Sequence, residues 1–391
     1  MLAKDLKETL FSLSFCTFGD LLTGLTFGYF THSLKSFPAL IILIPPAIAM
    51  RGNIFSTLGS RLGTYLHTGE ILIGRKSKLL NENIFSSLTL TFSMSFYLAF
   101  LSWLIAKHIG LKIDLISLCL ISLLAGFFSA MFLLFFTFLI AFSSYRKGWN
   151  PDNVTAPLIT LAGDIITLPL LFFSLEVVKE IKHDFQFPLF IIFLIASILS
   201  FYPIKMKNFK IIIKESLPIF MICGLLSTFS GFILGKKFEQ LMISSAMLAI
   251  IPAFLEDGGA IGGILAARFS SALHTGELKE MQLSKKAVQL FLLMHLIGLI
   301  IFPMIGIFGF LVGRFLNLGG ELLQMILISL LSGEILIFIV NFLAFYISML
   351  SFKFGINPDN VAIPILTSLM DFIGTACLIG IAFTVFRIRG Y

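Results

Sequence analysis

The sequence predicts an all-α polytopic membrane protein of about 11 transmembrane helices, with two parallel five-helix repeats joined by a linking helix. Three observations predict this fold class. Hydrophobic residues make up 58% of the 391 residues and charged residues 13%, a balance that the surface of a soluble domain does not carry. Nearly uncharged stretches of about 20 residues, the length that a helix needs to cross a bilayer, recur along the chain. The chain also repeats itself at an offset of 207 residues.

The two repeats are defined by phrases that recur at this one offset without a gap. They are KETL at Lys7 and KESL at Lys214, LHTGE at Leu66 and Leu273, and NPDNV at Asn150 and Asn357. Residues 1–184 and 208–391 are therefore predicted to be two copies of one unit, which is typical of duplicated transporters and channels. Residues 185–207 form the predicted linking segment.

Each repeat is expected to hold five spans. In the first repeat they lie at about 9–33, 37–60, 84–106, 113–143 and 151–176, and in the second at about 216–236, 241–265, 288–312, 322–351 and 358–385. Because five is odd, the chain leaves the first repeat on the wrong face to begin the second in the same orientation. The uncharged segment at 185–204 is long enough to bring it back. The repeats are therefore predicted to be related by a pseudo-twofold axis along the membrane normal.

The distribution of charge predicts the orientation. Lysines and arginines on the face that holds the N-terminus outnumber those on the opposite face. This favours a multi-pass protein of the cell (plasma) membrane, with a cytoplasmic N-terminus and with Tyr391 outside. Loop residues on the cytoplasmic face explain the net charge of +7, so membrane lipid and not nucleic acid is the expected neighbour.

A polar stripe runs along the fifth span of each repeat. Helical spacing places Asn153, Pro157, Thr160 and Asp164 on one face, and Asn360, Pro364, Thr367 and Asp371 on the matching face of the twin. Each proline lacks an amide hydrogen, so protein or water must receive the carbonyl oxygen four residues earlier. We predict that the two stripes line a central pore between the repeats.

Asp164 and Asp371 are the predicted metal ligands. An ionised carboxylate in the hydrocarbon zone costs on the order of 3 kcal/mol or more, so two carboxylates at equivalent positions suggest a shared cation. The surrounding groups are oxygens without a nearby Cys or His, which suits Mg²⁺ or Ca²⁺ better than zinc or copper. We expect Mg²⁺ as the transported and bound ion, and no cofactor. The alternative is that each aspartate is protonated or holds a neighbouring helix by hydrogen bonds.

The second span supplies the other predicted wall of the pore. IPPAIAMRGNIFSTLGSRL aligns with IPAFLEDGGAIGGILAARF, so that Gly52 matches Gly259 and Arg61 matches Arg268. Small residues let helix backbones approach closely, and Gly52, Asn53 and Gly259 are candidates for lining the pore. Helix packing explains each glycine equally well.

Together these motifs resemble the MgtE family of magnesium channels and transporters, especially its duplicated, solute carrier family 41-like branch. The motifs are PPAIAMRGNIFSTLGSRL, the LHTGE that follows it, and NPDNVxxPxxTxxxD. The resemblance implies a five-helix unit whose second and fifth helices line a pore, with two fused repeats in place of a dimer. It places the pore aspartate on Asp164 and Asp371, and a glycine-asparagine pair on Gly52 and Asn53. In the second repeat Ala260 stands where that asparagine is expected.

The repeats differ most where Ala49-Met50-Arg51 faces Glu256-Asp257-Gly258. Near a pseudo-twofold axis these segments would meet, so one hypothesis is that Arg51 pairs with Asp257 or Glu256. The other is that Arg51 extends toward the cytoplasmic interface.

Two mechanisms of transport stay open at this point, a divalent cation channel and an exchanger that couples Mg²⁺ to Na⁺ or H⁺. A carrier of a small organic solute is a more remote alternative. An enzyme is not expected, because the chain shows neither a serine with a base nor a zinc-binding helix motif, and no nucleotide loop is visible. The predicted partners are therefore Mg²⁺ or other hard divalent cations. A single chain is predicted to form its own pseudo-dimeric pore.

Overall fold

The computed structural model describes residues 2–29, 37, 40–75, 77–108, 110, 114–241, 245–278, 283–315 and 321–388. Within these ranges the chain forms eleven α-helices and one short 3-10 helix, and no strand. The helices are α1 (Leu2–Tyr29), α3 (Leu40–Thr68), α4 (Lys78–His108), α5 (Leu115–Arg146), α6 (Pro151–Glu180), α7 (His183–Leu199), α8 (Lys207–Leu241), α9 (Ser245–His274), α10 (Lys285–Phe315), α11 (Leu322–Lys353) and α12 (Pro358–Ile388). The predicted all-α fold class is confirmed.

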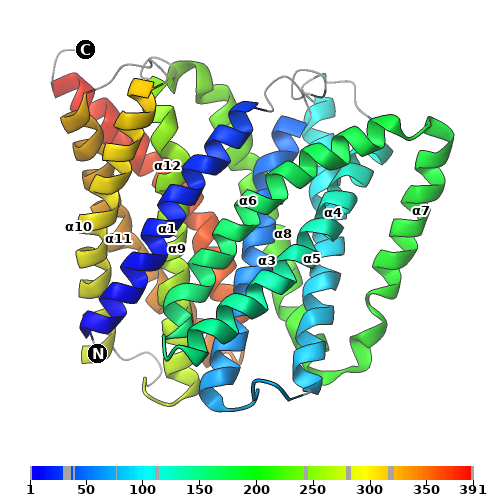
Figure 1. The fold of residues 1–391 in the computed structure, drawn as a ribbon, viewed down its shortest axis with the longest axis horizontal. Coiled ribbons are helices and arrows are strands. Elements are labelled where there is room, and N and C mark those ends of the chain that lie inside the picture. Colours follow the sequence, from blue (N-terminus) through cyan, green and yellow to red (C-terminus); the bar gives the residue numbers. More distant parts are fainter. Residues whose placement is uncertain are drawn as a thin grey trace.

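The helices repeat with the offset found in the sequence. The last three helices of the first repeat, α4, α5 and α6, begin at Lys78, Leu115 and Pro151, and their twins begin at Lys285, Leu322 and Pro358. Between the repeats, α7 returns the chain to the face where α1 begins (Figure 1). The predicted arrangement of five helices, one linking helix and five helices is confirmed. The predicted outer terminus, Tyr391, lies outside the described residues.

Seven segments of the described chain are long and apolar enough to cross a membrane, judged by length and composition. They are Lys78–His108, Leu115–Arg146, Asn153–Glu180, His183–Lys205, Lys285–Arg314, Leu322–Lys353 and Pro358–Ala382. Each coincides with a predicted span. The other four predicted spans fall on α1, α3, α8 and α9.

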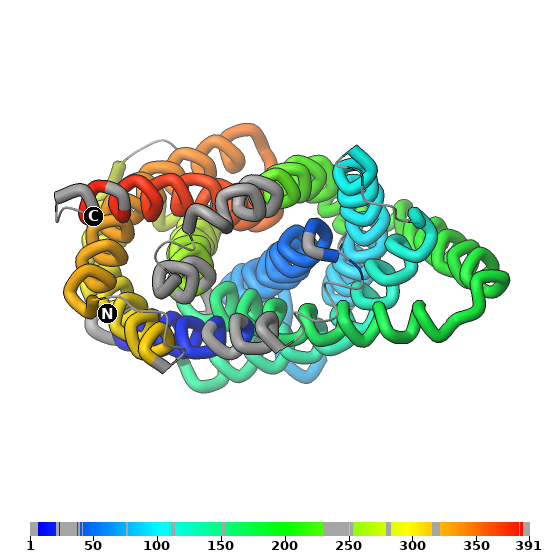
Figure 2. Tube along the Cα trace, turned by 90° about the horizontal axis from the view of Figure 1, so that it is seen from above, coloured from blue at the N-terminus to red at the C-terminus, as the bar shows by residue number. Residues whose placement is uncertain are grey.

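The first helix of each repeat packs against the other repeat as well as against the fifth helix of its own repeat. Leu13 of α1 belongs to a buried apolar core built from α9, α10, α11 and α12. Conversely, Phe209 and Phe220 of α8 belong to the core of α3, α4, α5 and α6. Figure 2 shows this exchange, with α1 in blue beside the yellow α10 and α8 in green beside the blue and cyan helices. The two repeats are therefore interlocked, and each core includes one helix from the other repeat.

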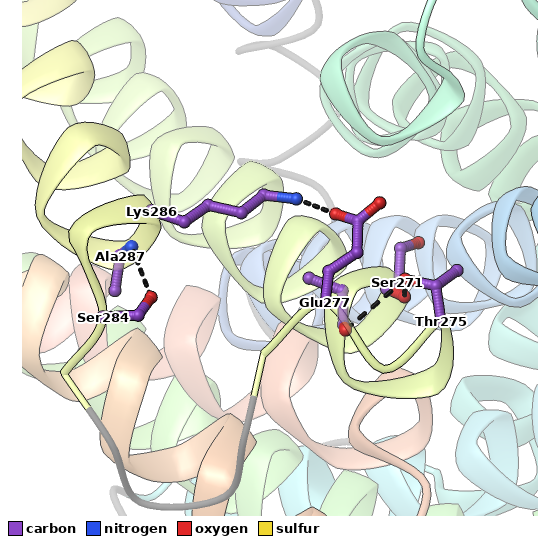
Figure 3. Close-up of polar contacts among 7 residues, drawn as sticks. Ser271, Thr275, Glu277, Ser284, Lys286 and Ala287 are labelled. Carbon is purple, nitrogen blue, oxygen red and sulfur yellow. Dashed lines mark hydrogen bonds and ion pairs between the residues drawn. The ribbon is translucent and has the colours of Figure 1, made fainter.

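The repeated phrase LHTGE ends the second helix of each repeat. Gly69 and Gly276 have φ angles of 76° and 73°, a left-handed conformation that glycine adopts without a steric penalty and that commonly ends a helix. After α9, the carboxylate of Glu277 forms an ion pair with Lys286, and the Ser284 hydroxyl accepts a hydrogen bond from the Ala287 amide (Figure 3). The ion pair joins the end of α9 to the first turn of α10.

Candidate functional site

Four helices meet between the repeats, and they are those predicted to line the pore. Within the repeats, α3 packs against α6 and α9 packs against α12. Across the repeats, α6 contacts α9, α12 contacts α3, and α3 contacts α9. The repeated stripes of α6 and α12 are thus brought to one region.

Asp164 of α6 and Asp371 of α12 are both half-buried in this region. Their carboxyl groups are close enough to interact electrostatically. The carboxyl group of Glu256, from α9, lies within hydrogen-bond reach of Asp164. Asp20 of α1 interacts with both Asp164 and Asp257. The structure therefore gathers three further carboxyl groups near the two predicted ligands, and none of the three has an acidic counterpart at the equivalent position of the other repeat.

These carboxylates do not form a preassembled ligand cage. In the part of the chain that the structure describes, no three Asp, Glu, His or Cys side chains are arranged to hold a metal ion. A cation between Asp164 and Asp371 would therefore need further oxygen ligands, from hydroxyl groups, amides or water.

Asn53 and Thr367 carry polar oxygens and join the two repeats by a hydrogen bond. The Thr367 hydroxyl donates to Oδ1 of Asn53 over 2.6 Å. Its twin, Thr160, donates instead to the Ala156 carbonyl within its own helix, over 3.0 Å. Asn53 has no twin, because Ala260 replaces it, so this contact exists on one side of the axis only.

The two predicted glycines lie where the second and fifth helices approach each other. A methyl group at Gly52 would stand 2.8 Å from Cγ2 of Thr160, which is a clash. A methyl group at Gly259 would stand 3.6 Å from Cγ2 of Thr367, which is ordinary contact. Close packing therefore requires glycine at residue 52 but not at residue 259.

Asn153 and Asn360 are bound by protein groups on both sides of the amide. Glu8 Oε2 accepts from Nδ2 of Asn153 and from the Asn150 backbone amide, both over 3.0 Å. At the other side, Nε of Arg268 donates to Oδ1 of Asn153. Because both asparagines are almost fully buried, neither presents a free amide to a cation in this conformation.

The second repeat contains the same arrangement. Glu215 Oε2 accepts from Nδ2 of Asn360 over 2.7 Å and from the Asn357 amide over 3.2 Å, and Arg61 Nη1 donates to Oδ1 of Asn360 over 2.8 Å. Sequence reasoning did not predict a role for Glu8 and Glu215. The signal was present, because they are the acidic residues of the recurring phrases KETL and KESL.

The carbonyl oxygens that Pro157 and Pro364 leave without a helical donor are received by protein. Ser12 of α1 donates to the Asn153 carbonyl over 2.9 Å. Ser216 of α8 donates to the Asn360 carbonyl over 3.4 Å. The first helix of each repeat therefore donates the hydrogen bond that the proline of the fifth helix cannot donate. These two carbonyl oxygens are thus bound by protein and do not face an ion.

The pseudo-twofold axis passes between Thr64 and Ser271, which occupy equivalent positions of α3 and α9. Their hydroxyl oxygens are 3.5 Å apart, and both side chains are buried. Asp359 of α12 accepts from Ser60 over 2.6 Å and from Thr64 over 2.8 Å. Polar contacts thus fill the space between the repeats at this end of the bundle.

The structure does not bring Arg51 and Asp257 together. Arg51 is buried and its Nη2 donates to the Ser95 hydroxyl of α4 over 2.5 Å, while Nε and Nη1 have no partner among the described residues. Asp257 accepts from Thr17 of α1 over 2.6 Å. Arg51 thus lies against the outer helices of its own repeat. Asp257 instead faces a helix of the other repeat.

Comparisons with known proteins agree with this architecture. The MgtE family, described as a divalent cation transporter, matches residues 44–174 and 251–381, two segments with the same offset of 207. Solute carrier family 41 member 3 of Mus musculus is 26% identical over 401 residues, which cover 94% of this chain and 80% of that protein.

Two further relatives are solute carrier family 41 member 2 proteins. That of Xenopus laevis is 25% identical over 407 residues, covering 95% of this chain and 70% of that protein. That of Homo sapiens is 25% identical over 395 residues, covering 92% of this chain and 67% of that protein. No solved structure matches the chain.

Proposed function

Because this chain belongs to the MgtE family of divalent cation transporters, we propose that it moves Mg²⁺ across the membrane along a path between its two repeats. The path is formed by α3 and α6 of residues 1–184 and by α9 and α12 of residues 208–391. A single chain then suffices for one path, and the N-terminal face is cytoplasmic. The observation that carries the proposal is that α6 and α12, which bear Asp164 and Asp371, meet α3 and α9 between the repeats, with the two half-buried carboxyl groups near enough to influence each other electrostatically.

Asp164 and Asp371 are the proposed ion ligands. Two like charges brought together in a low-dielectric region are costly, and a divalent cation between them removes that cost. Both side chains are half-buried among mostly buried neighbours, so they remain accessible from a narrow path. The Thr367 hydroxyl and the Asn53 amide oxygen lie one helical turn away on the N-terminal side of Asp371 and add neutral oxygen ligands.

Mg²⁺ fits this site better than a softer metal. Carboxylate, hydroxyl and amide oxygens are hard ligands, which zinc and copper sites seldom use alone. Mg²⁺ also retains several waters and is often held by only one or two carboxylates. A pair of aspartates without a full protein cage is therefore sufficient for a partly hydrated Mg²⁺.

A second candidate function is exchange of the divalent cation against Na⁺ or H⁺. It is favoured by the acidic residues that the symmetric pair does not require, namely Asp20, Glu256 and Asp257. Three additional carboxyl groups near the site would need charge compensation when the divalent ion leaves. A monovalent co-ion or protons would supply that charge.

The test is divalent-cation uptake into proteoliposomes under an imposed membrane potential. Asp164→Asn and Asp371→Asn should each abolish most Mg²⁺ uptake, because the amide keeps the shape but loses the charge. Asp184→Asn, at an exposed position of α7, is the matched control and should transport like the wild type. Mg²⁺ uptake that is unchanged by both site substitutions would refute the paired-aspartate site. Uptake that needs a Na⁺ or pH gradient would select the exchanger over the channel.

A further inference from the structure

Two hydrogen-bond chains join the repeats, and each is called a latch here. Latch 1 is Glu8–Asn153–Arg268 and latch 2 is Glu215–Asn360–Arg61. We propose that the two latches close the cation path on the face where α6 and α12 begin, and that a cation passes this level only when they open. This inference rests on the proposed function, because it concerns access to the Asp164–Asp371 site.

Each latch connects three helices from both repeats. In latch 1, α1 and α6 of the first repeat are joined to α9 of the second. In latch 2, α8 and α12 of the second repeat are joined to α3 of the first. Because each asparagine bonds a carboxylate on one side and a guanidinium on the other, its amide is held in one orientation by charge-assisted hydrogen bonds. Separation of the repeats must break both latches together.

At the pseudo-twofold axis, the contact between Thr64 and Ser271 leaves no room for a cation between these two residues. The hydroxyl oxygens of Thr64 and Ser271 are 3.5 Å apart. Mg²⁺ binds oxygen at about 2.1 Å, so two oxygens on opposite sides of it stand about 4.2 Å apart. Not even a dehydrated Mg²⁺ fits between these two residues without movement. The bonds from Ser60 and Thr64 to Asp359 hold α3 in this position against α12.

The latches lie between this face of the bundle and the proposed ion site. Asp164 follows Asn153 by eleven residues, which is about 16 Å along α6. A cation arriving from this face meets the guanidinium groups of Arg61 and Arg268 before it reaches a carboxylate of the site. Arg61 is fully buried and interacts electrostatically with the carboxyl groups of Glu215 and Asp359, so its charge is largely compensated within the latch region. The latches therefore oppose entry mainly by contact.

The first test measures how accessible residue 271, at the pseudo-twofold axis, is to water in the full-length protein solubilised in detergent. The thiol introduced by Ser271→Cys should react slowly with a water-soluble maleimide. Adding Asn360→Ala removes latch 2, and losing a hydrogen bond to a charged group should raise the reaction rate about tenfold or more. Arg61→Lys, which keeps the charge but loses the planar fork, should act in the same direction.

Cys377 provides the internal control for this experiment. It is a half-buried native thiol in the C-terminal half of α12, and its rate should not change in either variant. A rate at residue 271 that stays the same would overturn the proposal. Rates that rise equally at both thiols would also overturn it, because they would show that the variant only loosens the fold.

The second test asks whether transport needs the axis to open. In the double variant Thr64→Cys/Ser271→Cys, oxidation should form a disulfide and stop Mg²⁺ uptake into proteoliposomes, and a reductant should restore it. Each variant that carries only one of the two substitutions should be insensitive to the same oxidant. Uptake that continues in the cross-linked protein, or failure of the pair to cross-link, would contradict the latch proposal. If the wild type shows no uptake, the proposed function fails, while the maleimide rates still decide the latches.

Discussion

Asn153 and Asn360 occupy the same stripe as Asp164 and Asp371, and yet the structure gives them a different task. Spacing along a helix shows which residues share a face, but it does not show which of them are already bound by neighbours. Glu8 and Arg268 saturate the amide of Asn153, whereas no described basic residue pairs with Asp164. The repeated phrase therefore combines an inter-repeat contact at its start with a proposed ion ligand at its end.

The two equivalent glycines should respond differently to alanine. Gly52→Ala places a methyl group 2.8 Å from a Thr160 side chain that its own hydrogen bond to Ala156 holds in place. Such overpacking should lower the free energy of unfolding by about 1–3 kcal/mol. Gly259→Ala, with 3.6 Å of clearance, is the matched control and should change it by less than about 0.5 kcal/mol. Thermal unfolding of the solubilised protein measures both, and equal losses would contradict this account of the close approach.

Arg51 and Arg61 give a second matched pair at the residue scale. Arg51 has one hydroxyl partner, and two of its nitrogens lack partners, so Arg51→Met removes a poorly compensated buried charge. Stability should be unchanged or should rise by about 1–4 kcal/mol. Arg61 bonds both Asn83 and Asn360, so Arg61→Met should lower stability by about 1.5–3 kcal/mol. Denaturation curves that show a large loss for Arg51→Met would indicate a partner that this conformation does not contain.

At the scale of helices, α1 and α8 act as supports for α6 and α12. A proline inside a membrane helix leaves a carbonyl oxygen without its usual donor, and this is tolerated only where another group donates to it. Ser12 and Ser216 are those donors. The supporting helix and the proline-containing helix belong to the same repeat, so each repeat solves this problem internally.

Ser12→Ala tests the support of α6 by α1. It leaves the buried Asn153 carbonyl without a donor, which should cost about 1–3 kcal/mol of stability. Ser216→Ala removes the longer bond of 3.4 Å, compared with 2.9 Å for Ser12, and should cost less. Parallel thermal unfolding of the two variants provides the comparison. A larger loss for Ser216→Ala would show that the hydroxyl bonds do not explain the packing of these helices.

At the scale of the whole molecule, the repeat and the helix order could be predicted from the sequence because both depend on local properties. Hydropathy sets the length of a span, and an odd number of spans requires a linking helix such as α7. The exchange of α1 and α8 between the cores could not be predicted, because either repeat offers an apolar surface to an apolar helix. The hydrogen bond from Arg51 to Ser95 could not be predicted for a related reason. Arg51 has no equivalent in the other repeat, so the repeat symmetry does not indicate the direction of its side chain.

The exchanged helices predict that neither half of the molecule is stable alone. Residues 1–206 would lack Phe209 and Phe220, which lie in the core of α3 to α6, and residues 207–391 would lack Leu13 in the other core. Each half expressed separately should therefore aggregate on size-exclusion chromatography. Both halves expressed together should co-purify as one particle, because α1 and α8 then find their cores in the partner half. A half that is monodisperse alone and unfolds cooperatively would show that the interlocking is not needed for folding. If the co-expressed halves also take up Mg²⁺, then the covalent connection through α7 is not needed for transport. The path then depends only on the contacts between the two repeats.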